Sequence, residues 1–501
     1  MSAVLEAVRG YAQTQPDNIA VSGVGQSLSY SDLQGEVEKL SAKLLASGSK
    51  VLGVFADNSP AWIIIDLAAV AADIVLVPLP VYFSDRQLVH VIQDTGIDVV
   101  FTDQHSRIKA LNDSFQSTGA YDLFGGQISC VSTSSATTQI DIENISKITY
   151  TSGTTGAPKG VCLTQETLDK VAKSLALASD GKMSDLHLSV FPLAMLLENV
   201  GVYSVLLSGA TSIQLPLIDV GMHGSSGLDV KKMCDCFVEN NVTTTIMSPQ
   251  MLLALCHYLS NNKQHLSKLR FLAVGGAHVH EKLLALAVNC SLPVYQGYGL
   301  SECGSVVCLN TVVKNKASSV GLPLPHVEIK ISDDGEVCVK GALFRKYLSE
   351  TPVLLDSQGF YQTGDLGYMD DEGFLYIVGR KKHVFITSFG RNVSPEWPEE
   401  ELNMQTVIAQ SVVYGEGMAI NAAIIVPVQN VTETQIDKAV TAVNTTLPDY
   451  SRIGVWLYAD EPFSIMNQQL TSTGRLRRQI IWSVYGERIV TRYKQKGELF
   501  L

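Results

Sequence analysis

The stretch that decides the fold is Thr149-Tyr150-Thr151-Ser152-Gly153-Thr154-Thr155-Gly156-Ala157-Pro158-Lys159-Gly160. The apolar residues before it, 145–150, predict a buried strand. The loop itself has few side chains that could pack, and its glycines let the backbone approach a ligand closely. Successive N–H groups in such a turn form an anion-binding nest, and Lys159 adds a positive charge. The stretch therefore predicts a phosphate-binding loop.

An exposed flexible linker of similar composition is the alternative interpretation of this loop. The loop differs from the GxxxxGK[ST] phosphate loop, because Gly160 rather than serine or threonine follows Lys159.

Length and composition indicate a folded protein of more than one domain. The chain has 501 residues, of which 46% are hydrophobic and 17% are charged, with a net charge of -12. This length exceeds what one hydrophobic core supports. The negative charge argues against a nucleic acid partner. Nine cysteines without a CxxC pair indicate reduced thiols, and we expect a cytoplasmic protein.

The most apolar window, residues 62–83, is interrupted by Asp66, Asp73, Pro78 and Pro80. These interruptions favour a buried helix followed by a buried strand over a membrane span. We expect no signal peptide and no transmembrane segment.

Helical and strand patterns alternate through the first 300 residues. We expect helices at residues 32–46, 60–72 and 85–94, and strands at 21–30 (a hairpin), 51–56, 74–78, 98–102, 185–191, 210–215, 243–247, 271–274 and 293–296. Such alternation predicts an α/β fold whose parallel sheets are covered by helices. Ligands bind at the carboxyl ends of strands in sheets of this kind. The loops at residues 151–160, 275–277 and 297–302 follow predicted strands and are therefore the candidate site.

The remainder of the chain divides into two smaller parts. Short alternating strands after Gly304 predict a small β subdomain, roughly residues 305–379, within a large domain of residues 1–379. The basic link Arg380-Lys381-Lys382 precedes a compact α+β domain of residues 380–501, with expected helices at 433–447 and 476–485.

Four motifs occur along the chain in a characteristic order. They are residues 150–160, Gly297-Tyr298-Gly299-Leu300-Ser301-Glu302, Tyr361-Gln362-Thr363-Gly364-Asp365-Leu366-Gly367, and Gly379-Arg380-Lys381-Lys382 with Gly390-Arg391-Asn392-Val393-Ser394-Pro395. In this order they resemble the adenylate-forming (AMP-binding) superfamily of acyl-CoA synthetases, aryl-CoA ligases, firefly-type luciferases and peptide-synthetase adenylation domains. The resemblance covers nearly the whole chain.

The resemblance implies an AMP-forming acid–thiol ligase with a mobile C-terminal domain. Such an enzyme activates a small-molecule carboxylic acid with ATP and Mg²⁺ to an acyl adenylate, then transfers the acyl group to CoA or to the phosphopantetheine of an acyl carrier protein. The acid is expected to be apolar, fatty or aryl, because the segments expected to line its pocket, 191–203, 245–250 and 271–277, are mostly apolar or small. An amino acid is disfavoured, because no aspartate stands between Phe191 and Met195, where amino-acid-activating relatives often have one.

The resemblance also implies the roles of individual residues. Ser301 would contact the α-phosphate, Glu302 would hold Mg²⁺, and Asp365 would bind the ribose hydroxyls with help from Arg380. Lys382 would be the hinge and Gly390 would lie near the pantetheine. The β- and γ-phosphates would be held by Thr151, Ser152, Gly153, Thr154, Thr155, Gly156 and Lys159, and adenine would be flanked by Gly275, Gly276, Ala277 and Tyr298, with Gly297 and Gly299 in the same motif.

One departure from the family pattern bears on catalysis. Arg475 occupies the position where relatives have a lysine that bridges the acid and the α-phosphate, and arginine is longer, planar and not equivalent. Two alternatives therefore stay open besides a CoA ligase. One is a ligase that loads a carrier protein, and the other is a nucleotide-binding homologue with impaired catalysis.

Two histidines near a glycine-rich loop offer a weaker candidate. His278 and His280, with Glu281, could suggest a metal site, but their place after Gly275-Gly276-Ala277 favours the start of a helix.

Overall fold

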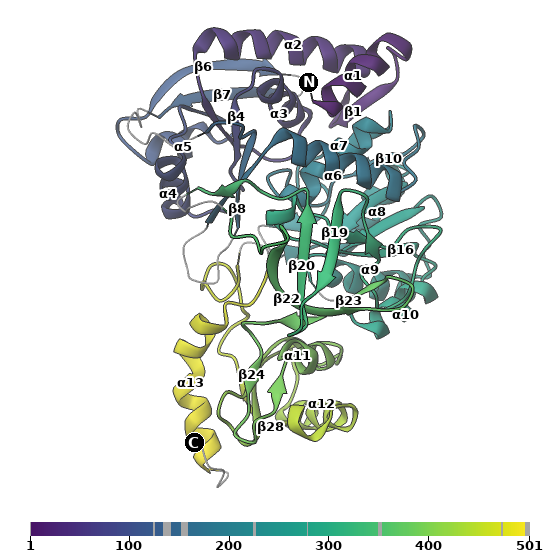
Figure 1. The fold of residues 1–501 in the computed structure, drawn as a ribbon, viewed down its shortest axis with the longest axis vertical. Coiled ribbons are helices and arrows are strands. Elements are labelled where there is room, and N and C mark those ends of the chain that lie inside the picture. The colour runs from purple at the N-terminus through teal and green to yellow at the C-terminus, as the bar shows by residue number, and fades with distance from the viewer. Residues whose placement is uncertain are drawn as a thin grey trace.

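The computed structural model describes residues 2–123, 126–133, 142–151, 159–223, 227–277, 279–348, 353–471 and 474–495. In Figure 1 the N-terminal elements lie at the top, a green antiparallel sheet lies in the middle, and the C-terminal elements form a separate body below.

An eight-stranded mixed sheet includes the strand before the phosphate-loop candidate. Its order is β21-β9-β8-β4-β3-β5-β7-β6, and the strands β3, β4, β5 and β8 are parallel. The bounds are β3 (Val51–Phe55), β4 (Val75–Pro78), β5 (Val99–Thr102), β6 (Gln116–Leu123), β7 (Gly126–Ser132), β8 (Lys147–Thr151), β9 (Lys159–Leu163) and β21 (Lys346–Tyr347).

A nine-stranded mixed sheet has the order β18-β17-β16-β15-β14-β10-β11-β1-β2, with β1, β11, β10, β14, β15 and β16 parallel. The bounds are β1 (Ile19–Gly23), β2 (Gln26–Ser29), β10 (Leu186–Leu188), β11 (Thr211–Ile213), β14 (Thr244–Met247), β15 (Phe271–Val274), β16 (Val294–Tyr298), β17 (Cys308–Leu309) and β18 (Leu322–Pro323). A separate two-stranded sheet joins β12 (Met222–His223) and β13 (Gly227–Leu228).

Helices connect the strands of both sheets. They are α1 (Ala3–Thr14), α2 (Tyr30–Ser47), α3 (Pro60–Ala71), α4 (Asp85–Thr95), α5 (His105–Ala110), α6 (Gln165–Ala178), α7 (Leu196–Leu207), α8 (Val230–Glu239), α9 (Pro249–Asn262) and α10 (Glu281–Asn289). Helix α4 begins at a capping box in which Ser84 and Gln87 satisfy each other's backbone N–H groups. Helix α3 is buried along its first ten residues, which explains the apolar window. No helix among the described residues is long and apolar enough to cross a bilayer.

A four-stranded antiparallel sheet, here called the β subdomain, follows the large sheets. Its order is β19 (Val327–Ile331), β20 (Glu336–Gly341), β22 (Tyr361–Met369) and β23 (Leu375–Arg380). A 3₁₀ turn, η1 (Ser301–Cys303), lies between β16 and β17.

The C-terminal body, here called the small domain, contains its own sheet of three strands. These are β26 (Ile408–Tyr414), β27 (Asn421–Pro427) and β28 (Ile453–Tyr458). One face of the sheet packs against α11 (Glu396–Asn403) and α12 (Glu433–Thr446), and the other face packs against α13 (Arg478–Gln495). Each face has its own apolar cluster. The small domain also has a hairpin of β24 (Phe385–Ile386) and β25 (Asn392–Val393) and a 3₁₀ turn, η2 (Asp449–Ser451).

The α/β architecture expected from the sequence is confirmed, with corrections. Both large sheets carry antiparallel strands at their edges, so the parallel pairing covers only their centres. The β6–β7 hairpin was not expected, because most residues of β6 are exposed and give no apolar signal. Helix α13 extends to Gln495 and is thus ten residues longer than expected at its end.

A charged network lies inside the core where β8 meets two helices. The Lys147 Nζ donates to Asp66 Oδ1 on α3 at 2.8 Å and also to Asn199 on α7. Asn199 Nδ2 donates in turn to Asp66 Oδ2 at 2.7 Å, and both charged side chains are 1% exposed. Burial lowers the pKa of Lys147, and Asp66 opposes this shift. The network ties the strand that enters the phosphate-loop candidate to the core.

Replacing Lys147 with methionine should destabilise the fold strongly. The Lys147→Met variant keeps the length of the side chain but leaves the Asp66 carboxylate buried without its cation, which costs about 3–5 kcal/mol. The free energy of unfolding from urea titration measures the loss. Lys170→Met is the matched control, because the Lys170–Glu166 ion pair is exposed on α6 and should contribute little. Equal stabilities of the two variants would contradict the account of the network.

Candidate active site

Asp365 is the most enclosed of the candidate ligand-binding carboxylates. It lies on β22 opposite Arg380 on β23, and the Arg380 Nε is 2.6 Å from Asp365 Oδ1. The Tyr298 hydroxyl at the end of β16 donates to Asp365 Oδ2 at 2.6 Å. Burial raises the pKa of Asp365, whereas Arg380 and Tyr298 stabilise its charged form. Two neighbouring strands and the distant strand β16 thus meet at this carboxylate.

A second cluster joins Glu302 to Lys159 through Tyr347. The Tyr347 hydroxyl donates to Glu302 Oε1 at 2.8 Å, and the Lys159 Nζ lies 5.0 Å from the centroid of the Tyr347 ring. Backbone pairing explains the meeting, because β21 pairs with β9 and the Phe344 N–H donates to the Glu302 carbonyl. Tyr361 closes the cluster with a hydroxyl 3.3 Å from that of Tyr347.

The two ends of the phosphate-loop candidate are fixed by strand pairing. Thr151 and Lys159 are register partners in the antiparallel pair of β8 and β9. The expected ligand residues Ser152, Gly153, Thr154, Thr155 and Gly156 lie outside the described residues.

Glycines bring the backbone of the candidate adenine-binding loops together. A Cβ at Gly275 would lie 3.2 Å from the Gly297 carbonyl oxygen, and one at Gly299 would lie 1.7 Å from that of Ser305. Residue 299 must therefore be glycine for this turn to close. Gly276 has a φ of +83° and faces open space, and Ala277 after it is exposed.

Arg475 reaches this region from the small domain. Its Nη2 donates to the Gly276 carbonyl at 3.3 Å. Arg475 keeps exposed surface, yet the surrounding protein and the neighbouring Arg380 lower its pKa, whereas Asp365 and Glu302 raise it. A guanidinium nevertheless stays charged at neutral pH in proteins. The cation of the small domain therefore faces the two carboxylates of the large part.

Lys382 lies close to the same charges. Burial lowers its pKa, and Arg380 and Arg475 lower it further. Lys381, the residue before, pairs instead with Asp334 and Glu336 of the β subdomain at 2.7 Å each. The link between the two bodies is thus anchored on the β subdomain up to residue 381.

Other candidates are less clearly assembled. Ser301 is partly buried at the start of η1, beside Glu302. Gly390 lies at the tip of the β24–β25 hairpin. Its N–H donates to the Thr387 carbonyl and the Ser388 N–H donates to the Met418 carbonyl, so both hydrogen bonds stay within the small domain. His280 caps helix α10 as expected, while His278 lies outside the described residues.

Sequence reasoning did not identify Tyr347 and Tyr361 as members of the cluster. Tyr347 touches both Glu302 and Lys159, but it stands outside the four motifs. Only the pairing of β21 with β9 brings it to the site, and a two-residue strand leaves no readable pattern in the sequence.

A cavity lies between α7 and the nine-stranded sheet. Its apolar wall includes Gly201, Val205, Ile246, Phe271, Ala273 and Leu309. Ala273 and Gly275 are two residues apart along β15 and its continuation, so they face the same side of the sheet. The cavity therefore lies on the sheet face that carries Gly275. Its residues Thr244 and Phe271 stand at the amino ends of β14 and β15, whereas the glycine loops follow the carboxyl ends of the strands.

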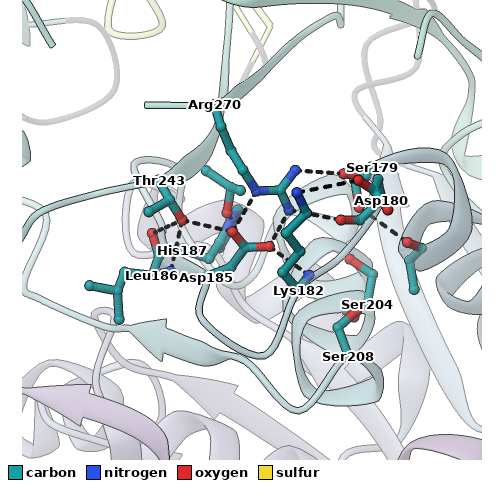
Figure 2. A network of polar contacts seen from close by, with 12 residues as sticks. Ser179, Asp180, Lys182, Asp185, Leu186, His187, Ser204, Ser208, Thr243 and Arg270 are labelled. Atoms are coloured by element: carbon teal, nitrogen blue, oxygen red, sulfur yellow. Dashed lines mark hydrogen bonds and ion pairs between the residues drawn. The ribbon is translucent and has the colours of Figure 1, made fainter. Parts of the chain in front are cut away.

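Polar groups at the outer end of the cavity are satisfied by one another. Figure 2 shows Arg270 between Asp185 and the 179–180 carbonyls, with Ser204 and Ser208 nearby. The Arg270 Nε lies 2.6 Å from Asp185 Oδ1. His187 is held by Thr244 and Glu198 at 3.0 and 3.1 Å. Because these groups bond within the protein, the cavity offers an apolar ligand mainly carbon surface.

No three histidine, cysteine, aspartate or glutamate side chains gather to hold a metal within the part of the chain that the structure describes. Glu302 is a single hard oxygen ligand. A Mg²⁺ ion is commonly held by one or two carboxylates together with substrate phosphates, so the site fits Mg²⁺ that arrives with a nucleotide.

The sequence is similar to CoA ligases of long-chain fatty acids and to CoA ligases of aromatic acids. The chain is 26% identical over 485 residues to the human long-chain-fatty-acid–CoA ligase 1, covering 80% of this chain and 69% of that protein. It is 32% identical over 290 residues to the 2-succinylbenzoate–CoA ligase of Bacillus cytotoxicus, covering 54% of this chain and 56% of that protein.

Solved structures share the fold. The O-succinylbenzoate CoA synthetase of Bacillus subtilis in complex with AMP superposes with a TM-score of 0.75 at 22% identity, covering 94% of this chain and 97% of that chain. The anthranilate CoA ligase AuaEII in complex with anthranoyl-AMP gives a TM-score of 0.81 at 16% identity, covering 97% of each chain.

Two family models match successive parts of the sequence. The model of the AMP-binding enzyme matches residues 8–348, and that of the AMP-binding enzyme C-terminal domain matches residues 382–497. The resemblance drawn from the four motifs is confirmed: the chain belongs to the AMP-binding enzyme family.

Proposed function

We propose that this protein is an AMP-forming acid–CoA ligase that activates an apolar carboxylic acid. The observation that carries the proposal is the meeting of Asp365, Glu302, Lys159 and Arg475 at one edge of the two large sheets. Two anionic reactants need cations and N–H donors where charge develops, and nucleotide hydroxyls need a carboxylate acceptor. This edge offers both.

In the first step, a carboxylate oxygen of the acid attacks the α-phosphorus of ATP. The bond from that phosphorus to the bridging oxygen breaks, and pyrophosphate leaves. The product is an acyl adenylate, whose AMP is a far better leaving group than an oxide. In the second step a thiolate attacks the acyl carbon, AMP departs with its oxygen, and a thioester remains.

We propose roles in ATP binding that the family resemblance implies and that the contacts of these residues support. Asp365 accepts the ribose hydroxyls while Arg380 and Tyr298 hold its carboxylate in place. Gly276 and Ala277 flank the adenine together with Tyr298. Lys159 and the loop that precedes it bind the β- and γ-phosphates, and Ser301 faces the α-phosphate.

Glu302 would hold Mg²⁺ with the phosphate oxygens, and its hydrogen bond from Tyr347 fixes one carboxylate oxygen. When bound, Mg²⁺ neutralises phosphate charge. Arg475 lies across from these groups and is suited to contact both the carboxylate of the acid and the α-phosphate, since a guanidinium can fork to two oxygens.

The cavity beside α7 supports an apolar substrate class. Its satisfied polar groups leave an apolar wall, which suits an alkyl chain or an aromatic ring. The similar long-chain and succinylbenzoate ligases act on acids of these two kinds. An amino acid would bring an ammonium group that no carboxylate between Phe191 and Met195 could pair.

We further propose that the chain divides after residue 379 into the large domain and the small domain of residues 380–501, with Lys382 as the hinge. The Gly390 hairpin then approaches the thiol in the second step. CoA is the proposed acceptor, and a pantetheinylated carrier protein is the competing one. Measuring thioester formation with each acceptor in turn distinguishes the two.

The function is tested by acid-dependent exchange of labelled pyrophosphate into ATP with Mg²⁺. We expect medium- and long-chain fatty acids or aryl acids to support exchange, because their apolar parts suit a wall of mainly carbon surface. Amino acids and short dicarboxylates should support at least about tenfold less, since each buried charge without a partner costs more than 1.4 kcal/mol. A flat response across such a panel would contradict the proposal.

Arg475 should be needed for the first step. Its replacement by alanine removes a cation aimed at developing charge, so exchange should fall by about 10²–10³-fold. Arg475→Lys keeps the charge and should retain exchange within roughly tenfold of the wild type. Exchange that is unchanged in Arg475→Ala would refute the role. A large gain in Arg475→Lys would instead show that the native arginine limits catalysis.

A further inference from the structure

Helix α11 of the small domain rests on the start of α10 of the large domain. Glu401 lies between the N-cap residue of α10 and a residue of its first turn: its Oε1 is 3.1 Å from His280 Nε2, and its Oε2 is 2.7 Å from Lys282 Nζ. The Glu401 side chain is only 11% exposed. The contact therefore joins the two bodies through a shielded carboxylate rather than through a fully hydrated surface pair.

The His280 ring is held in the orientation that this contact requires. Its Nδ1 accepts the Lys282 N–H at 3.0 Å as the cap of α10. The Nε2 of the neutral ring then carries the proton, which it donates to Glu401. Burial raises the pKa of Glu401, but the hydrogen bonds from Lys282 and His280 outweigh this effect and the pKa is lowered. Glu401 is thus charged at neutral pH.

A second contact comes from the same end of α11. Met404, three residues after Glu401, packs against the large-domain apolar cluster that contains Leu283 and Ala287 of α10. Residues three apart lie on one face of a helix, and Met404 follows the last residue of α11 directly. One face of α11 therefore carries both an ionic and an apolar contact to the large domain.

The segment that receives Glu401 also receives Arg475. Arg475 donates to the carbonyl of Gly276, which precedes His280 by four residues. The small domain thus touches residues 276–282 at two points, one in the site and one outside it. Movement of α11 away from α10 would carry Arg475 away from Gly276.

We propose that Glu401 is a positioning residue for adenylate formation. Its bonds to His280 and Lys282 hold the small domain on α10, so that Arg475 stays in the site. The inference rests on the proposed function, in which Arg475 acts on the acid and the α-phosphate. Glu401 itself touches neither reactant.

The proposal separates the two half-reactions. Glu401→Gln should lower acid-dependent pyrophosphate exchange by roughly five- to tenfold, as expected for the loss of one largely shielded charge pair. Thioester formation from a supplied acyl adenylate and CoA should stay within about twofold, because that step starts after Arg475 has acted. Glu433→Gln is the matched control, since the Glu433–Arg492 pair lies within the small domain. It should change neither step.

Reversal of the charges tests whether the pair itself matters. Glu401→Lys and Lys282→Glu should each lower exchange, and the double variant should recover most of it. Equal losses in both half-reactions, unchanged exchange in Glu401→Gln, or no recovery in the double variant would each overturn the proposal.

A distance measurement tests the contact without relying on activity. All nine cysteines are buried, so cysteines introduced at the exposed Val288 on α10 and Val484 on α13 can be spin-labelled selectively. We expect one dominant label–label distance in the parent and a broadened distribution in Glu401→Gln. The same distribution in both would overturn the proposal. If the parent catalyses no exchange with any acid, the proposed function fails, while this comparison still decides whether Glu401 holds the small domain.

Discussion

The ion pair between Asp365 and Arg380 is the constraint on which the rest of the site depends. It lies at the last antiparallel pairing of β22 and β23, where the β subdomain ends and the small domain begins. Asp365 is 3% exposed, so its charge is stable only because Arg380 and Tyr298 bind it. Through Tyr298 the pair fixes the end of β16, and through Arg380 it fixes the start of the link that carries Lys382. The candidate nucleotide site and the proposed hinge thus share one anchor.

The same principle recurs through the molecule, in that shielded polar pairs join segments far apart in sequence. Lys147 and Asp66 connect a strand to a helix in the core, Glu302 and Tyr347 connect the turn after β16 to the edge strand β21, and Glu401 connects the two bodies. Buried pairs add little net stability compared with apolar packing, yet removal of one partner is strongly destabilising. Such pairs therefore fix which segments meet more than they strengthen the fold. For an enzyme that must bring two anions together, fixed positions of charge are what the chemistry requires.

Local sequence signals predicted the elements with strong periodicity. The capping box at Ser84, the hairpin of β1 and β2, and the buried helix α3 all follow from neighbouring residues. The motifs placed Asp365, Glu302 and Lys159 in one site, and the structure brings these residues together. The β6–β7 hairpin was missed because its outer strand is exposed and lacks the apolar alternation of a half-buried strand.

Contacts between distant segments could not be predicted from the sequence. Tyr347 reaches Glu302 only through the pairing of β21 with β9, and no residue near Tyr347 indicates that pairing in the sequence. Glu401 is one of several acidic residues on α11, and its neighbours Glu399 and Glu400 have the same side chain. Glu399 turns inward to Arg478 of its own domain, whereas Glu401 turns to the large domain. The difference depends on how two bodies meet, which periodicity does not encode.

The proposed function depends on a nucleotide that binds between the phosphate-loop candidate and Asp365. Titration calorimetry of ATP with Mg²⁺ tests it most directly, with Asp365→Ala beside Asp370→Ala, whose carboxylate bonds Lys316 in a turn of the same sheet. We expect the wild type and Asp370→Ala to bind ATP alike, and Asp365→Ala to bind at least about tenfold more weakly through loss of a charged acceptor. Equal affinity in Asp365→Ala, or no heat of binding in the wild type, would contradict the account.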